Sequence, residues 1–205
     1  GFACNLADGA AVNTLLPRII RHFGQAPDLI VNNASRFAHD DAGTLVDIEL
    51  AAHLAINLSA PVLLATGLAA HLEDGRTGVV INITDQRVRH PNGDQLSYTL
   101  SKQALTAATL TLARALAPRV RVNAVAPGLT LPTDDYRPAQ MVALEEMMPL
   151  KRLPEPEEVA DAVSWLANAE AVTGQTLYVD GGASLKGFDR DFIYLGSVGT
   201  APDQQ

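Results

Sequence analysis

The chain has one cysteine, Cys4, among its 205 residues. A single cysteine cannot form an intrachain disulfide or a cysteine-rich metal site, so the composition suits a reducing compartment, and we expect a cytoplasmic protein. The first residues, GFACNLADG, have neither the basic start nor the apolar core of a signal peptide. The five histidines lack the spacing of metal ligands, so no metal site is predicted.

Basic residues are also scarce. The 15 Lys and Arg are outnumbered by 23 Asp and Glu, which gives a formal net charge of −8. Nucleic acids and anionic membranes attract clusters of Lys and Arg, so neither is expected as a partner. Hydrophobic residues make up 47% of the chain, enough for one sizeable core. We therefore expect a single domain over residues 1–205 that binds a small molecule.

Short apolar runs rich in β-branched residues alternate with longer amphipathic segments. Apolar strands that alternate with helices are typical of a parallel sheet covered on both faces. The sequence therefore predicts a doubly wound α/β domain, followed by a tail at 183–205 without a clear period. Strands are expected at 27–34, 77–85, 119–128 and 175–182, and helices at 8–23, 47–72, 95–117 and 155–169.

Small and polar residues end each predicted strand, in the motifs NNAS, TDQ, PGLT and DGG. In a doubly wound sheet the ligand binds beyond the carboxyl ends of the strands. Small residues there allow backbone amides to approach the ligand closely. Taken one at a time, these motifs are better explained by Gly and Asn turning the chain.

Tyr98 and Lys102 stand four residues apart in a predicted helix, so both lie on one face. A phenol with a reference pKa of about 10 is a weak acid at neutral pH unless a nearby cation stabilises the phenolate. Lys102 would supply that cation. The spacing is modest evidence for a catalytic pair by itself.

Six motifs follow one another along the chain: NNA, INLSAP with Asn57, INITD, YTLSK, RVNAVAPG and VTGQTLYVDGG. Their order and spacing resemble those of the short-chain dehydrogenase/reductase family from about residue 3 to residue 185. The resemblance implies a Rossmann-like fold and NAD(P)-dependent hydride transfer, with Tyr98 as the proton donor. It further implies that Lys102 holds the nicotinamide ribose and lowers the pKa of Tyr98, and that Asn57 organises a water in the proton relay.

The same resemblance assigns a set of cofactor-binding residues. They are Asn5, Leu6, Asn33, Ala34, Ser35, Thr84, Tyr98, Lys102, Pro127, Gly128 and Thr130. The Gly-rich turn that binds the pyrophosphate in this family has no counterpart near residue 1. We therefore expect the first strands of the fold, with that turn, in a segment that precedes this sequence.

Asp85 departs from the common family pattern, which has Ser thirteen residues before the Tyr. A carboxyl donates only when protonated, so Asp85 suits a substrate that needs a proton on a ring nitrogen. The pteridine reductases carry Asp at this place, and NNASRF and PGLTLPTDD also resemble them. The resemblance implies NADPH as the cofactor and a pterin bound by Phe37, Asp85, Tyr98 and Leu129, with Phe37 stacking on the ring.

Each of these residues has an alternative interpretation. Phe37 can pack in the core, Asp85 can cap the following turn, and Asp134 and Asp135 can belong to a solvated loop. Reduction of a ketone, such as a 3-oxoacyl thioester or a sugar, is a second hypothesis, and a catalytically degenerate binding or oligomerisation subunit is a third. The Ala- and Leu-rich helices at 47–72 and 95–117 predict subunit contacts, and the resemblance implies a homotetramer.

Overall fold

The computed structural model describes residues 1–196, so residues 197–205 of the predicted tail lie outside the described residues. Four strands form one sheet in the order β1-β2-β3-β4, and every neighbouring pair is parallel. The strands are β1 (Leu29–Asn32), β2 (Gly78–Ile83), β3 (Val120–Pro127) and β4 (Thr176–Val179). Each observed strand lies inside the range predicted for it, because the small and polar residues at the ends of that range do not pair with the neighbouring strand.

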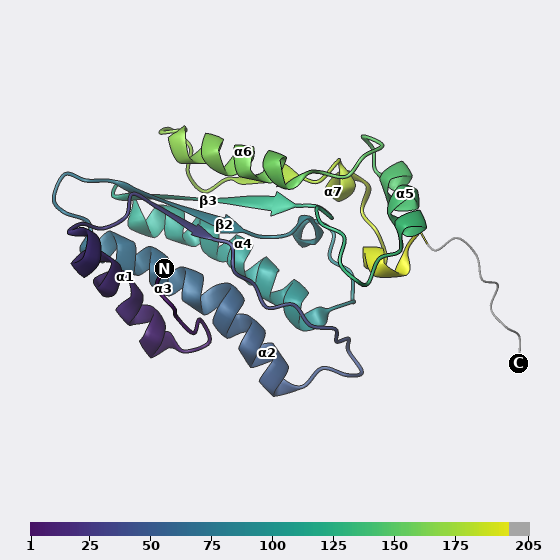
Figure 1. Ribbon diagram of the computed structural model, residues 1–205, viewed down its shortest axis with the longest axis horizontal. Helices are drawn as coiled ribbons and strands as arrows, with labels where there is room; N and C mark the ends of the chain where they lie inside the picture. The colour runs from purple at the N-terminus through teal and green to yellow at the C-terminus, as the bar shows by residue number, and fades with distance from the viewer. Residues whose placement is uncertain (197–205) are drawn as a thin grey trace, which may run out of the picture.

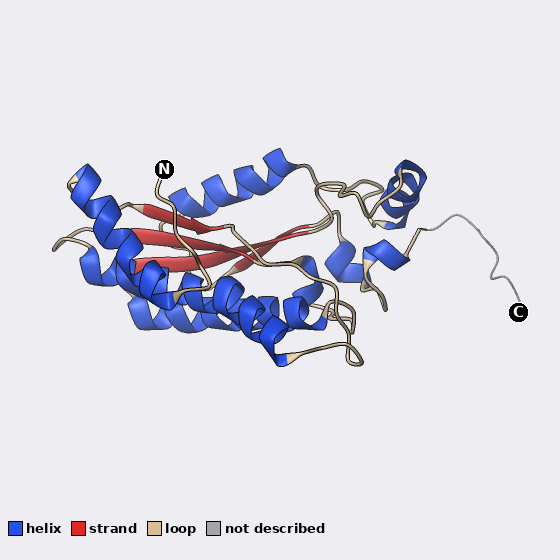
Figure 2. Cartoon of the chain, turned by 60° about the horizontal axis from the view of Figure 1, so that its bottom comes forward, coloured by secondary structure: helices blue, strands red, loops and turns tan. Residues whose placement is uncertain are grey.

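Helices cover both faces of the sheet. The helices α1, α3 and α4 lie on one side and α6 on the other (Figure 1), and the sheet runs between these layers in the rotated view of Figure 2. This arrangement confirms the predicted doubly wound α/β class. The helices are α1 (Gly9–Phe23), α2 (Asp47–Leu54), α3 (Ala60–His71), α4 (Leu96–Leu116), α5 (Pro138–Met147), α6 (Pro156–Asn168) and α7 (Ala183–Lys186).

The alternation of side chains along the central strands explains why those strands are mostly apolar. Val80 faces the core beneath α3 and α4, and its neighbour Ile81 faces the core beneath α6. Both are fully buried. Successive residues of a strand point to opposite faces, so a sheet covered on both sides favours apolar residues at consecutive positions.

A chain of buried polar groups ties two strands to α4. The Asn32 side chain donates to Asn82 Oδ1 at 2.8 Å, and Asn82 Nδ2 donates to Thr109 Oγ1 at 2.9 Å. Asn32 and Asn82 are also partners in the β1–β2 register. A slip of one residue would leave these buried amides unpaired, so the network favours a single register.

The predicted helix at 47–72 contains an irregularity that the sequence did not indicate. Residues Ala55–Ser59 form a π-helix, η1, between α2 and α3.

The stretch Asp47–His71 is long and apolar enough to cross a membrane by length and composition alone. Core helices of soluble proteins meet the same criterion, and here α3 packs against α1, α4 and the sheet.

Three helical segments were not predicted: α5, α7 and the 3₁₀-helix η3 (Phe192–Tyr194). They form a third apolar cluster with the buried Leu144, Met148, Ala183 and Phe192. The described part of the tail is therefore packed and partly helical. Its helices are only three and four residues long, too short to show a period of 3.6.

Candidate active site

A cavity of about 330 Å³ opens at the carboxyl ends of β2 and β3. This is where ligands bind in doubly wound sheets. The loop after β1, the 3₁₀-helix η2 (Gln86–Val88), the loop after β3 and the C-terminal segment supply its walls. The lining residues are Phe37, His39, Asp85, Gln86, Arg87, Gly128, Leu129, Thr130, Leu131, Thr133, Asp135, Tyr136, Asp191, Phe192 and Ile193.

Asp85, Tyr98 and Lys102 come together beside this cavity, as their spacing predicts. The Tyr98 hydroxyl donates to Asp85 Oδ2 at 2.9 Å. Lys102 Nζ donates to the carbonyl of Ile83 at 2.7 Å and lies 5.6 Å from the centre of the Tyr98 ring. Asp85 follows β2 and caps the 3₁₀-helix η2, and the other two lie one turn apart on α4, so ordered elements hold all three groups.

The buried setting changes the acidity of two of these groups. Burial, and next the Asp85 carboxylate, raise the pKa of Tyr98 well above its ordinary value. Burial also lowers the pKa of Lys102 to about 8, although Asp85 opposes that shift. The expected lowering of the Tyr98 pKa by Lys102 is therefore outweighed here, because burial and a neighbouring carboxylate both disfavour phenolate. Tyr98 keeps its proton at neutral pH and can act as an acid.

Asp85 performs the capping role and faces Tyr98 at the same time. Its Oδ1 accepts a hydrogen bond from the backbone N–H of Arg87 at 2.8 Å, which caps η2. Its Oδ2 faces Tyr98. The two interpretations of Asp85 are compatible because each uses a different carboxylate oxygen.

Asn57 lies in η1, and its amide holds the loop that follows β1. Its Oδ1 accepts from the Arg36 backbone N–H at 2.7 Å and the Ser35 hydroxyl at 3.2 Å. Its Nδ2 donates to Arg36 O and to Ser101 Oγ, each at 2.9 Å. Four hydrogen bonds fill the capacity of this amide. The proposed role in a water relay stays a prediction.

Phe37 stands at the cavity rather than in the core. Its side chain is 48% exposed, and its ring meets that of Tyr98 edge to face, with 4.9 Å between the ring centres. The predicted substrate residue Leu129 lines the same cavity, with Gly128 and Thr130. At Gly128 a Cβ atom would come within 2.9 Å of the Asp180 backbone, so this position requires glycine.

The other predicted cofactor residues lie along the same edge of the sheet. Asn33, Ala34 and Ser35 follow β1 and are exposed, whereas Thr84 is buried and donates its hydroxyl to Val125 O. Pro127 ends β3. Leu6 and Ala34 line a second, apolar cavity of about 320 Å³ beside β1, and the exposed Asn5 is next to Leu6 in the chain.

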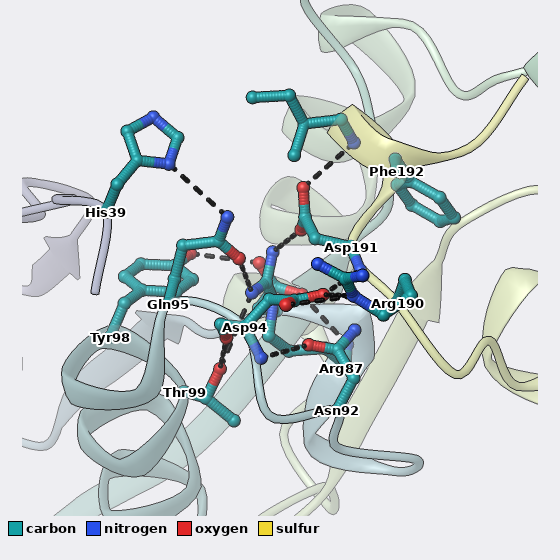
Figure 3. A network of polar contacts seen from close by, with 12 residues as sticks. His39, Arg87, Asn92, Asp94, Gln95, Tyr98, Thr99, Arg190, Asp191 and Phe192 are labelled. Atoms are coloured by element: carbon teal, nitrogen blue, oxygen red, sulfur yellow. Dashed lines mark hydrogen bonds and ion pairs between the residues drawn. The ribbon is translucent and has the colours of Figure 1, made fainter. Parts of the chain in front are cut away.

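Sequence reasoning missed a polar network behind Asp85. Figure 3 shows Arg87 at its centre, between Gln95 and Asp191. Asp134 and Asp135 are exposed in their loop, as expected, and Asp135 also lines the cavity with Tyr136. Arg87 can be suspected from its place two residues after Asp85, but nothing local points to Asp191, which is 104 residues further along.

Among residues 1–196, no group of three or more His, Cys, Asp or Glu is placed to hold a metal ion. Three groups are available for chemistry at this edge: the Tyr98 hydroxyl, the Asp85 carboxylate and the buried ammonium of Lys102. Such groups transfer protons to a bound ligand.

Comparison with known proteins agrees with this fold. Residues 2–184 match the family described as Enoyl-(Acyl carrier protein) reductase. The structure of FolM alternative dihydrofolate reductase 1 from Brucella canis, complexed with NADP, superposes with a TM-score of 0.80 and 41% identity. The match covers 88% of this chain and 71% of that one.

Two curated relatives represent two different activities. The dihydromonapterin reductase of Enterobacter sp. (strain 638) is 36% identical, over 76% of this chain and 66% of its own length. The 3-oxoacyl-[acyl-carrier-protein] reductase FabG of Escherichia coli (strain K12) is 33% identical, over 89% of this chain and 76% of its own. The chain belongs to the short-chain dehydrogenase/reductase family of NAD(P)-dependent oxidoreductases.

The depressed pKa of Lys102 predicts how stability depends on pH. Between pH 8 and 10.5 the unfolded chain binds a proton at this lysine that the folded chain has lost, so the free energy of unfolding rises with pH. Across that window the group contributes roughly 3 kcal/mol. Denaturant unfolding at pH 8, 9 and 10 should show this rise in the wild type and a much smaller one in Lys102→Met. Lys151→Met, at an exposed lysine, is the control, and equal slopes in all three proteins would contradict the prediction.

Proposed function

We propose that this protein reduces a pteridine, of the dihydropterin or dihydrofolate type, with NADPH as the hydride donor. The observation that supports it is the hydrogen bond from Tyr98 to Asp85 Oδ2 at the wall of a cavity that also presents Phe37. An aromatic face and a proton-donating carboxyl group suit a flat heteroaromatic ring with a basic nitrogen. The similarity to a dihydromonapterin reductase and to FolM supports the same substrate class.

The residues present fit the nicotinamide half of the cofactor. The ammonium of Lys102 has three N–H groups, of which one donates to the carbonyl of Ile83, so two remain for a ribose diol. Small residues after β1 and β3 allow close approach to their backbone amides. Asn33, Ala34, Ser35, Thr84, Pro127, Gly128 and Thr130 would line this half of the cofactor, with Asn5 and Leu6 nearer its adenine end.

In the proposed mechanism the bound cofactor supplies the hydride, and the protein supplies the proton. Phe37 orients the ring, and Asp85 Oδ2 faces the nitrogen that gains the proton. Tyr98 gives its proton to the Asp85 carboxylate through their hydrogen bond, and Asp85 passes a proton on to that nitrogen. Lys102 lies 5.6 Å from the Tyr98 ring and offsets the negative charge that this transfer creates.

An NADPH-oxidation assay tests the proposal directly. The substrates to compare are dihydrobiopterin, dihydromonapterin, dihydrofolate and an acetoacetyl thioester, with NADH as the alternative cofactor. Turnover of a dihydropteridine with NADPH supports the proposal. Turnover of the thioester alone would favour the ketone reductase, which the similarity to FabG also supports. Absence of turnover with every substrate would favour the degenerate subunit.

We expect Tyr98→Phe to lose most turnover while keeping the fold, because the substitution removes the hydroxyl and little volume. With general acid catalysis removed, kcat should fall roughly 100-fold or more. Tyr178→Phe, which lies on β4 away from the cavity, is the matched control and should leave kcat unchanged. Retained activity in Tyr98→Phe would exclude the mechanism.

Phe37 and Asp85 should affect different kinetic constants. Phe37→Ala removes a stacking face and should raise KM roughly threefold to tenfold, whereas Phe23→Ala, at an exposed ring on α1, should not. Asp85→Asn keeps the size but has no titrating proton, so it should lower kcat and flatten one limb of the pH profile, with less effect on KM. Asp85→Ser should lower pterin reduction while maintaining or improving ketone reduction. Unchanged dihydropterin kinetics in both Asp85→Ser and Phe37→Ala would leave the ketone reductase as the better hypothesis.

We also infer a homotetramer of cytoplasmic, single-domain subunits. Leu100 and Leu110 of α4 and Ile48 of α2 are exposed by 41%, 57% and 71%. Apolar side chains exposed on long helices are typical of subunit interfaces. Light scattering at micromolar concentration should give four times the subunit mass, and a monomer would contradict the inference.

A further inference from the structure

The C-terminal segment, residues 188–195, forms one wall of the cavity through Phe192 and Ile193. It is docked by two side chains from elsewhere in the chain. Gln140 Nε2 on α5 donates to the carbonyls of Phe192, Ile193 and Leu195 at 3.2, 3.0 and 2.8 Å. Asp94 Oδ2 accepts from the backbone N–H of Asp191 at 2.8 Å. The segment therefore has a defined position against the site.

Within this segment, Asp191 forms a buried ion pair with Arg87. Arg87 Nη2 lies 2.5 Å from Asp191 Oδ2, and the two side chains are 8% and 6% exposed. The other oxygen, Asp191 Oδ1, accepts from the Ile193 backbone N–H at 3.0 Å. One carboxylate thus fixes both the guanidinium and the start of η3.

The same guanidinium contacts both proton-carrying groups of the site. Its Nε donates to Asp85 Oδ1 at 3.3 Å, and its Cζ lies 5.1 Å from the centre of the Tyr98 ring. Its Nη1 donates to Gln95 Oε1 at 3.0 Å. Because Arg87 holds Asp85 Oδ1 through both Nε and its backbone N–H, Oδ2 is left for Tyr98 and the cavity.

Burial makes this arrangement sensitive to the loss of any one charge. Burial opposes the charge on Arg87, but the Asp85 and Asp191 carboxylates outweigh it and raise the pKa of Arg87. A buried ion that loses its partner is strongly disfavoured. Without Asp191, Arg87 would balance Asp85 alone; without Arg87, two carboxylates would share the region with no guanidinium between them.

We propose that Asp191 and Arg87 are positioning residues for the reduction, through which the C-terminal segment sets the orientation and the charge balance of Asp85. This inference rests on the proposed function, because it assigns Asp85 the proton that reaches the substrate. It makes residues 188–195 part of the catalytic apparatus, although they lie beyond the last strand.

The proposal predicts opposite effects of the two charges on the limb of the pH profile at which activity falls as pH rises. Arg87→Gln removes a cation 3.3 Å from Asp85, so the limb should move to higher pH. Asp191→Asn frees Arg87 to act on Asp85 alone, so the limb should move to lower pH. The other titratable groups around Asp85 are present in every variant; they are His39, Tyr98, Lys102, Asp135 and Tyr136. Arg87 lowers and Asp191 raises the pKa of Tyr98 and Tyr136 as well, so these groups shift in the same direction.

The experiment compares Arg87→Gln, Asp191→Asn, the double variant and Arg87→Lys, with Asp189→Asn as the matched control at an exposed carboxylate of the same segment. The kinetic readouts are kcat, KM and the pH profile of NADPH oxidation with the substrate that the wild type turns over. Hydrogen exchange of residues 188–195 is measured in parallel and needs no substrate, so it tests the docking of the segment even if the pteridine assignment fails.

We expect each single variant to lower kcat roughly 10-fold to 100-fold with a smaller change in KM, and to speed exchange in residues 188–195. The double variant, which has neither charge, should return this limb toward the wild-type position, and Arg87→Lys should restore part of kcat. Asp189→Asn should behave as the wild type. If Arg87→Gln fails to fold, the pH profiles and the hydrogen exchange of Asp191→Asn and the double variant test the proposal.

A limb that does not move in Asp191→Asn, or that keeps in the double variant the displacement seen in Arg87→Gln, would overturn the proposal and leave the ion pair with a structural role alone. Unchanged exchange in residues 188–195 would equally overturn it. Failure of the proposed function is recognised separately, because the wild type would then turn over no dihydropteridine.

Discussion

One buried guanidinium balances two carboxylates, and the arrangement of the site depends on it. Arg87 lies between Asp85 and Asp191, at 3.3 and 2.5 Å. Charges with so little access to water need close partners, so each of the three limits where the other two can lie. Asp85 Oδ2 faces the Tyr98 hydroxyl in consequence, and the C-terminal segment is held against the cavity.

The parallel sheet supplies the other fixed points. Asp85 follows the end of β2, Gly128 follows the end of β3, and both meet at one edge because all four strands run in the same direction. The buried Asn32–Asn82 pair fixes the register of β1 on β2. Small errors in register would move whole side chains to the opposite face.

The environment of Tyr98 keeps its phenol protonated. Burial and Asp85 raise its pKa, and Lys102, itself buried with a pKa of about 8, lies on the same helix. A protonated phenol in this place can serve as an acid. The Phe37 ring at the cavity adds a flat apolar surface beside it.

The sequence by itself determined what depends on neighbouring residues. Strand and helix periods gave the α/β class, and the spacing of Tyr98 and Lys102 placed them on one helix face, because such patterns are local. Tertiary structure decided the contacts between distant segments. Asn57 meets Arg36 and Ser101, and Arg87 meets Asp191 across 104 residues. No local period encodes such pairs; only the folded chain brings them within hydrogen-bonding distance.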